Sequence, residues 1–404
     1  MKFNRELVKG SIVLLAAFGV FNAMNFVYHF SMARILSLEN YGKLAALFSI
    51  IYILTILTEA VQVVITKYTA NAKNEGKVKN ILKRSLAKGA LLALSLTLVY
   101  ALASLALYKK LKIELSLMLL NGAFIFFAIL SPITRGVLQG QKRFFSLGTN
   151  MALEGVLKVL LGIALVFAGL QVYGAIGGVI FAALLAFAFS FAQLKNVLRA
   201  KEKRARVSDI YSYSLSALVA LFAILTFFSL DVIIAKAIFP PQTAGAYSIA
   251  SILSKIIFWG TAPIGKAMFP LTSNENSKKE KRKTLLNAFA FVLVCSLAAL
   301  IAFSLLPGFI VKIFSGKSLP GASQILPLLG ISMTLLSLTN LYLLYKLSQG
   351  KVKGVFFLPF LLIIQIVLLY NPAHTLASYA KSAAFSSALF AIGTLALVKI
   401  SSRN

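Results

Sequence analysis

Residues 174–206 read GAIGGVIFAALLAFAFSFAQLKNVLRAKEKRAR, and this stretch decides the fold class. Its first 21 residues contain no charged side chain, whereas the following twelve contain six Lys or Arg and one Glu. A helix of about 20 apolar residues crosses the hydrocarbon core of a bilayer. The stretch therefore predicts a membrane-spanning helix that ends in a short basic loop.

The same alternation of apolar runs and polar gaps extends along the whole chain, and hydrophobic residues make up 59% of its 404 residues. It predicts an all-α, multi-pass membrane protein with about twelve transmembrane helices. The expected spans are residues 7–30, 42–66, 86–108, 113–134, 147–170, 174–194, 210–235, 244–268, 285–306, 322–345, 354–370 and 375–398.

The distribution of the 41 Lys and Arg residues orients these spans. When a residue within three positions of a span end is counted with the adjacent terminus or gap, thirty lie at the two termini or in the even-numbered gaps, eight lie in the odd-numbered gaps, and three lie deeper inside spans. Cytoplasmic loops of membrane proteins carry the excess of Lys and Arg. We therefore expect both termini to lie in the cytoplasm and the protein to reside in the plasma membrane.

The formal net charge of +30 would suggest nucleic-acid binding in a soluble protein, but here the charge lies in short loops such as 195–206 and 278–283. We expect these loops to meet anionic lipids of the inner leaflet and not nucleic acid.

No segment between the spans is long enough for a catalytic domain, which argues against an enzyme. His29 and His374 have no Cys or acidic residue at metal spacing, so we expect no metal and no bound cofactor. The single cysteine, Cys295, is expected to be a small apolar filler.

The chain also shows an internal repeat. At a shift of 203 residues Gly42 meets Gly245, and Thr69 meets Thr272. Six spans return the chain to its starting side, so two six-helix halves would form parallel repeats. We expect an N-terminal lobe at residues 1–195, a basic cytoplasmic linker at 196–209 and a C-terminal lobe at 210–404.

Polar side chains inside the spans carry the functional signal, because ionisable groups are costly there and usually face a cavity or a partner. In the N-terminal half they are Asn22, Asn25 and His29 with Arg34 at the outer end, Glu59 with Gln62 and Thr66, and the pair Glu154 and Lys158. In the C-terminal half they are Asp231, Lys255, Asn340 and Lys381. Both halves thus have polar faces that could line one central cavity.

Each of these groups also has a structural interpretation. Glu154 and Lys158 are four residues apart and could form a buried ion pair. Arg34 and Lys381 could extend to the membrane interface. The uncharged stripes could hydrogen-bond neighbouring helices instead of a ligand.

Several motifs resemble the polysaccharide-exporter and oligosaccharide flippase family of the multidrug/oligosaccharidyl-lipid/polysaccharide (MOP) superfamily. They are ARILSLENYGKL at residues 33–44, RGVLQGQKRF at 135–144, the pair Leu230 and Asp231, AGAYSIA at 244–250, and FPL at 269–271. The resemblance covers nearly the whole chain, and its most distinctive element is the RGVLQG sequence.

This resemblance implies a two-lobed carrier that moves a polyprenyl-linked oligosaccharide from the cytoplasmic to the outer leaflet by alternating access. Basic residues in the cavity can meet the lipid phosphate, and polar residues can bind sugar hydroxyls. Candidate substrate-binding residues are Arg34, Lys255, Lys381, Arg135, Asn22, Asn25, His29 and Asn340. Glu59, Asp231, Glu154 and Lys158 are candidates for coupling to H⁺ or Na⁺, and glycan-assembly enzymes are candidate partners.

Two other classes of function remain open at this point. A multidrug or cation antiporter of the same superfamily would use acidic residues such as Asp231, but a basic cavity repels cationic drugs. The third class is a non-transporting membrane protein, either a scaffold or a membrane glycosyltransferase. A transferase needs acidic catalytic residues on a loop, and the outer loops and their edges offer only Glu39 and Glu114, far apart in the sequence.

The predicted topology can be tested with reporter fusions. A reporter that is active only outside the cytoplasm should be active when inserted near residue 240 and inactive near residue 280, because the two gaps lie on opposite sides of the membrane. The opposite pattern would show that the orientation is inverted, and equal activity at both positions would contradict the span between them.

Overall fold

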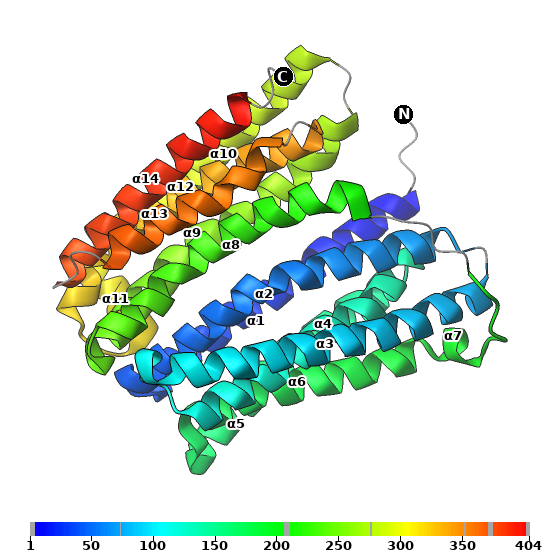
Figure 1. Ribbon diagram of the computed structural model, residues 1–404, viewed down its shortest axis with the longest axis horizontal. Coiled ribbons are helices and arrows are strands. Elements are labelled where there is room, and N and C mark those ends of the chain that lie inside the picture. The colour runs from blue at the N-terminus through cyan, green and yellow to red at the C-terminus, as the bar shows by residue number, and fades with distance from the viewer. Residues whose placement is uncertain are drawn as a thin grey trace. The chain divides into compact units, whose positions relative to one another are not determined.

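The computed structural model describes residues 5–72, 74–205, 211–274, 277–350, 353–370 and 375–400. All the secondary-structure elements assigned in these ranges are helices, which confirms the all-α prediction (Figure 1). The elements are α1 (Arg5–Ile35), α2 (Leu38–Ala70), α3 (Glu75–Leu111), α4 (Leu115–Gly140), α5 (Phe144–Leu165), η1 (Val166–Leu170), α6 (Gln171–Gln193), α7 (Lys195–Arg199), α8 (Tyr211–Ile238), α9 (Pro241–Asn274), α10 (Lys278–Leu305), α11 (Pro307–Ser315), α12 (Pro320–Ser348), η2 (Lys353–Phe357), α13 (Leu358–Tyr370) and α14 (Leu376–Ile400).

Nine helical stretches in the described ranges are long and apolar enough to cross a membrane. One of them, Phe144–Gln193, is 50 residues long and contains α5, η1 and α6, which correspond to two expected spans. The expected span at 354–370 matches a shorter apolar helix, Gly354–Tyr370. A multi-pass membrane protein is confirmed, and the count of twelve spans stays a prediction.

Local sequence explains where several helices begin. The side chains of Ser37, Asn74 and Ser277 accept a hydrogen bond from the backbone N–H three residues later, at the starts of α2, α3 and α10. Short polar side chains at this position satisfy backbone donors that the first turn leaves unpaired. A proline occupies the first turn of α11 and of α12, where no backbone N–H is needed.

The described chain divides into two compact units. The first comprises Met1–Asn40 with Leu54–Ile210, and the second comprises Tyr41–Ile53 with Tyr211–Asn404. The start of α2 is therefore grouped with the second unit, whereas the sequence expectation kept residues 1–195 together. The described part of the expected linker contacts the first unit, since Lys203 N donates to Gly76 O at 3.1 Å.

The linker is held by side chains from α3. Asn80 donates to Glu202 at 2.6 Å, and Lys83 forms an ion pair with the same carboxylate at 3.3 Å. These contacts lower the pKa of the exposed Glu202 below its usual value. Lys79 Nζ also donates to Leu198 O at 2.7 Å and to Ala200 O at 3.0 Å, so α3 holds this segment through both the Glu202 carboxylate and backbone oxygens.

The two units share a pattern of helix pairing. In the first unit α1 packs on α5, α3 on α4, and α6 on both α4 and α5. In the second unit α8 packs on α13, α10 on α12, and α14 on both α12 and α13. A shift by six spans matches α1 with α8, α3 with α10, α4 with α12, α5 with α13 and α6 with α14. The pairs in the second unit are therefore the ones that the repeat predicts.

Residues matched by the 203-residue shift also have matched surroundings. Thr69 Oγ1 donates to Gly136 O of α4 at 3.4 Å, and Thr272 Oγ1 lies 2.7 Å from Ser348 Oγ of α12. Gly42 and Gly245 are in direct contact, because a Cβ on Gly42 would lie 3.1 Å from Gly245 Cα. These contacts support a structural repeat over chance identity.

Glycines set the closest helix packing in the first unit. A Cβ on Gly178 of α6 would lie 2.4 Å from the backbone N of Gly162 of α5. The neighbouring Gly177 has more space, since its Cβ would meet only Leu165 Cδ1 at 3.7 Å. The backbone of α5 and α6 can approach this closely only where no side chain intervenes.

This packing predicts different effects for two adjacent substitutions. Gly178→Ala should lower the free energy of unfolding by about 1–3 kcal/mol, because backbone atoms would have to move apart. Gly177→Ala is the matched control and should change it little. Thermal unfolding of both variants in detergent measures the difference, and equal midpoints would contradict the packing.

Candidate functional site

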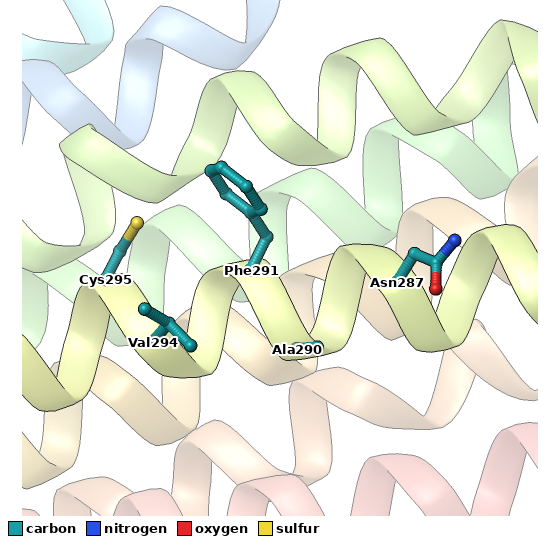
Figure 2. A pocket seen from close by; sticks show the side chains of 5 residues that line it. All are labelled: Asn287, Ala290, Phe291, Val294 and Cys295. Atoms are coloured by element: carbon teal, nitrogen blue, oxygen red, sulfur yellow. The ribbon is translucent and has the colours of Figure 1, made fainter.

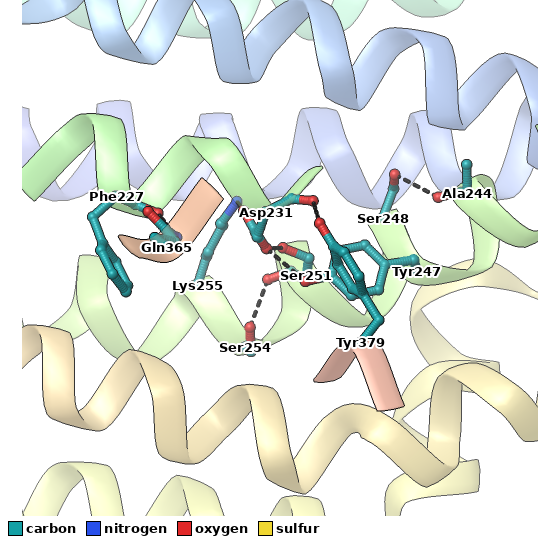
Figure 3. Close-up of polar contacts among 10 residues, drawn as sticks. All are labelled: Phe227, Asp231, Ala244, Tyr247, Ser248, Ser251, Ser254, Lys255, Gln365 and Tyr379. Atoms are coloured by element: carbon teal, nitrogen blue, oxygen red, sulfur yellow. Dashed lines mark hydrogen bonds and ion pairs between the residues drawn. The ribbon is translucent and has the colours of Figure 1, made fainter. Parts of the chain in front are cut away.

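A buried ion pair lies in the second unit, between α8 and α9. Lys255 Nζ lies 2.9 Å from Asp231 Oδ1, and the two side chains are 0% and 7% exposed (Figure 3). The other carboxylate oxygen of Asp231 accepts hydrogen bonds from Ser251 at 2.6 Å and from Tyr247 at 3.1 Å. The carboxylate is thus bonded to one cation and two hydroxyl groups, as a buried charge requires.

Aromatic and backbone contacts close this ion pair on its other sides. Lys255 Nζ lies 4.6 Å from the centre of the Phe228 ring, and Tyr379 of α14 donates to the backbone oxygen of Asp231 at 2.6 Å. The rings of Tyr247 and Tyr379 pack edge to face at 4.9 Å. The charge of Lys255 is therefore neutralised within the unit, so its expected contact with substrate would require Asp231 to move away.

The local sequence of α9 explains part of this cluster. Tyr247, Ser251 and Lys255 are spaced by four residues, so they lie on one face of the helix. This four-residue spacing in the sequence is enough to place Tyr247 on the same face as Lys255. Ser248 lies off this face and donates to Ala244 O at 2.8 Å. The contribution of Tyr379, from more than 120 residues further along the chain, had no sequence signal.

A second buried cluster lies in the first unit and joins α4 to α5. Arg135 of the RGVLQG motif forms an ion pair with Glu154. Its Nε also donates to Asn150 Oδ1 at 2.9 Å, and Asn150 Nδ2 donates to Ala186 O of α6 at 2.7 Å. Glu154 and Lys158, which share a helix face and could pair, form no ion pair among the described residues, and the carboxylate of Glu154 is bonded to Arg135 of the neighbouring helix.

Lys158 has a different partner, because α1 packs against α5 at its position. Its ammonium group donates to the side-chain oxygen of Asn25 and lies 5.1 Å from the centre of the Tyr28 ring and 5.8 Å from that of Phe21. Tyr28 is fixed in turn by a hydrogen bond to Ala175 O at 2.9 Å. A neutral amide and two aromatic faces thus surround a buried cation.

The rest of the RGVLQG motif packs α4 against α2. A Cβ on Gly136 would lie 2.9 Å from Gln62 O, so α4 approaches the backbone of α2 directly. Gln62 donates to Gln139 at 2.9 Å, and Thr66 donates to Gly136 O at 3.3 Å. The polar stripe of α2 thus bonds a neighbouring helix at these two positions, as the structural interpretation of the stripe predicted.

The remaining candidates of the first unit are dispersed. Asn22 and Glu59 are exposed, on α1 and α2. His29 is buried with its ring edge to face on Tyr28, and Arg34 is exposed with its guanidinium 4.5 Å from the centre of the Phe30 ring. On α1, Asn25 contacts another candidate, Lys158.

In the second unit, Asn340 is buried on α12 and Lys381 is exposed on α14. Among the hydrogen bonds and ion pairs of the described residues, neither side chain is bonded to Asp231 or Lys255. His374 lies outside the described residues. No group of three His, Cys, Asp or Glu that could hold a metal ion occurs in the described ranges.

The buried charges of the described residues are strongly unbalanced. The buried cations are Lys43, Arg135, Lys158, Lys236 and Lys255, and the buried carboxylate is that of Asp231. Even when the partly buried Glu154 is included, positive side chains outnumber negative ones. An interior of this composition favours an anionic ligand over a cationic one.

Solved structures of known proteins share this fold. The chain is similar to a multidrug resistance MATE family transporter of the MOP superfamily in an inward-facing conformation, at 16% identity and a TM-score of 0.77 over 97% of this chain and 98% of that chain. It is similar to the lipid II flippase MurJ in an inward closed conformation, at 14% identity and a TM-score of 0.71 over 96% and 87%. It is also similar to a MOP superfamily transporter from Pyrococcus furiosus, at 14% identity and a TM-score of 0.57 over 98% and 94%.

These similarities define the class of the protein, a multi-pass helical membrane protein with the fold of the MOP superfamily transporters. Within that class, the model of the polysaccharide biosynthesis protein family matches residues 7–275, and the chain belongs to this family. The resemblance noted from the RGVLQG and related motifs is thereby confirmed. No curated protein sequence matches the chain. The similar structures are described as transporters and a flippase.

The buried ion pair leads to a prediction about stability. Asp231→Asn and Lys255→Met should each lower the free energy of unfolding by about 3–5 kcal/mol, because each leaves one buried charge without its partner. The double variant should lose less than either single variant. Thermal unfolding of purified protein in detergent measures all three.

A control for the network around the pair is available on the same helix. Ser254 donates to Ser251 O and not to Asp231, so Ser254→Ala should have a smaller effect than Ser251→Ala. For the ion pair itself, the double variant Asp231→Asn with Lys255→Met is decisive. If its loss of stability equals the sum of the two single losses, Asp231 and Lys255 are not coupled.

Proposed function

We propose that this protein is a flippase for lipid-linked oligosaccharides. It would move a glycan attached to a polyprenyl phosphate or diphosphate from the cytoplasmic to the outer leaflet by alternating access. The proposal is supported by membership of the polysaccharide biosynthesis protein family and by the similarity of the fold to that of the lipid II flippase.

The observation that carries the proposal is the excess of buried cations. A diphosphate-linked lipid presents an anionic group that must enter the membrane, and Lys and Arg are the side chains that bind phosphate oxygens. A carrier of cationic drugs would need an excess of buried negative charge instead. The buried carboxylate, that of Asp231, is already bonded to Lys255. For the Pyrococcus furiosus transporter, the reversed polarity of its binding pocket likewise suggests a different function.

The geometry of the two clusters suggests different roles for their lysines. Glu154 forms its ion pair with Arg135, and Lys158 contacts a neutral amide and aromatic rings, so no carboxylate among the described residues is bonded to Lys158. Lys255 is neutralised by Asp231. We therefore assign phosphate binding first to Lys158 and the exposed Arg34, with Lys381 and Arg135 as further candidates.

Two other groups of residues complete the proposal. Asn22, Asn25, His29 and Asn340 provide hydrogen-bonding groups of the kind that sugar hydroxyls need. The Asp231 and Lys255 pair is the leading candidate for coupling, because H⁺ or Na⁺ binding to the carboxylate would release the lysine. Glu59 and Glu154 are the alternative carboxylates for that role.

The flippase proposal can be tested with purified protein in proteoliposomes. A fluorescent polyprenyl-diphosphate oligosaccharide placed in one leaflet should become accessible in the other. Lys158→Met and Arg34→Gln should reduce the rate at least about tenfold, the effect of losing one charge-assisted phosphate contact. Lys312→Gln, at an exposed position on α11, should leave it unchanged.

Thermal unfolding of each variant separates a loss of transport from a loss of folding, and the exposed Arg34 gives a variant with little expected effect on stability. Normal transfer in both folded variants would overturn the assignment of these cations to the phosphate. No transfer by the unmodified protein under ion gradients of either sign, together with efflux of a cationic dye, would favour the antiporter alternative.

A further inference from the structure

The cytoplasmic start predicted for α10 concentrates basic residues. The first six positions of the helix read KKEKRK, so five cations surround one carboxylate, Glu280. Lys279 and Lys283 are exposed and form no ion pair with any residue in the described ranges. Both ammonium groups are therefore accessible to an anion from outside the protein.

A shallow groove begins one helical turn beyond these lysines on the same helix. It has a volume of about 410 Å³ and is lined by Asn287, Ala290, Phe291, Val294 and Cys295 (Figure 2). The side chains of Phe291 and Val294 are 66% and 67% exposed. Cys295, expected to be a small apolar filler, is exposed at the groove. The lining of the groove is therefore mostly apolar and exposed.

The lysines and the groove lie on one face of α10. Lys279, Lys283 and Asn287 are spaced by four residues, and Phe291 follows after four more, so they form one line along the helix. Lys278 and Lys281 project from other sides of the same turns. Glu280 shares the face with Lys279 and Lys283, which leaves a net positive charge there.

We propose that this face of α10 binds an acidic phospholipid of the cytoplasmic leaflet. The phosphate-bearing headgroup contacts Lys279, Lys283 and the amide of Asn287, and one acyl chain lies along Ala290, Phe291 and Val294. Long lysine side chains reach headgroups from the edge of the bilayer, and anionic headgroups bind juxtamembrane basic residues. The inference concerns a bound lipid and not the transported substrate, so it does not depend on the proposed function.

Charge and surface composition favour a lipid over a protein partner. The exposed large side chains of α10 beyond the basic turns are apolar: Leu286, Phe291, Leu293, Val294, Leu297, Ile301 and Leu305. This is the composition of a helix side that faces hydrocarbon. A cationic end joined to an apolar groove matches the two parts of an anionic phospholipid.

The single cysteine of the chain provides the test, because Cys295 can be labelled without other substitutions. The protein carries a small fluorophore on Cys295 and is placed in liposomes that contain either brominated phosphatidylglycerol or brominated phosphatidylcholine. Phosphatidylglycerol should reach half-maximal quenching at a mole fraction about fivefold lower, the effect of roughly one net cation near the headgroup. Equal quenching by both lipids would overturn the proposal.

A matched pair of variants tests the named lysines. Lys279→Gln with Lys283→Gln should abolish the preference for phosphatidylglycerol. Lys278→Gln with Lys281→Gln removes the same charge from other sides of the helix and should preserve the preference. Equal loss in both double variants, or retention in both, would overturn the site.

Two further measurements guard against an artefact of the label and against a different occupant. Native mass spectrometry of unlabelled protein should find more retained phosphatidylglycerol in the control double variant than in Lys279→Gln with Lys283→Gln. Unbrominated phosphatidylglycerol should also relieve the quenching at a lower concentration than polyprenyl phosphate does. The reverse order would assign the groove to the substrate's lipid tail and overturn the proposal.

Discussion

The structure depends on one constraint, which is that a charged group inside a membrane protein must find its partner within the protein. The ion pair of Asp231 and Lys255 satisfies this constraint in the second unit, with hydroxyl groups completing the coordination of the carboxylate. Arg135, Glu154 and Asn150 satisfy it in the first unit. In each unit the ion pair joins two long helices that follow one another in the chain, α4 with α5 and α8 with α9, so the cost of burying charge also favours the packing of these helices side by side.

The two clusters use the same arrangement of residues with a different balance of charge. Polar residues at i, i+4 and i+8 line one face of a helix in each unit: Asn150, Glu154 and Lys158 on α5, and Tyr247, Ser251 and Lys255 on α9. A neighbouring helix supplies a cation to the first line, through Arg135, and an anion to the second, through Asp231. The first cluster therefore keeps a net positive charge and the second is neutral. This asymmetry underlies the different roles proposed for Lys158 and Lys255.

The motif that identified the family has a structural basis as well. In RGVLQG, the glycines allow α4 to approach α2, Gln139 bonds Gln62 across the contact, and Arg135 points to α5. One short segment thus connects three helices of the first unit. The spacing of Arg and Gly in the motif follows from helical geometry, because residues on one face recur every three or four positions while Arg135 must project to the other side.

The sequence by itself determined the class of structure. Apolar runs of the length of a bilayer, basic gaps and the 203-residue repeat predict a helical membrane protein with two similar halves, because these properties depend on composition and periodicity along the chain. Periodicity also placed Glu154 and Lys158 on one helix face. Only the tertiary structure decided that Glu154 binds Arg135, that Lys158 meets Asn25, and that Tyr379 supports Asp231. The spacing of residues in a helix fixes the face that they share, but it does not state which neighbouring helix that face meets.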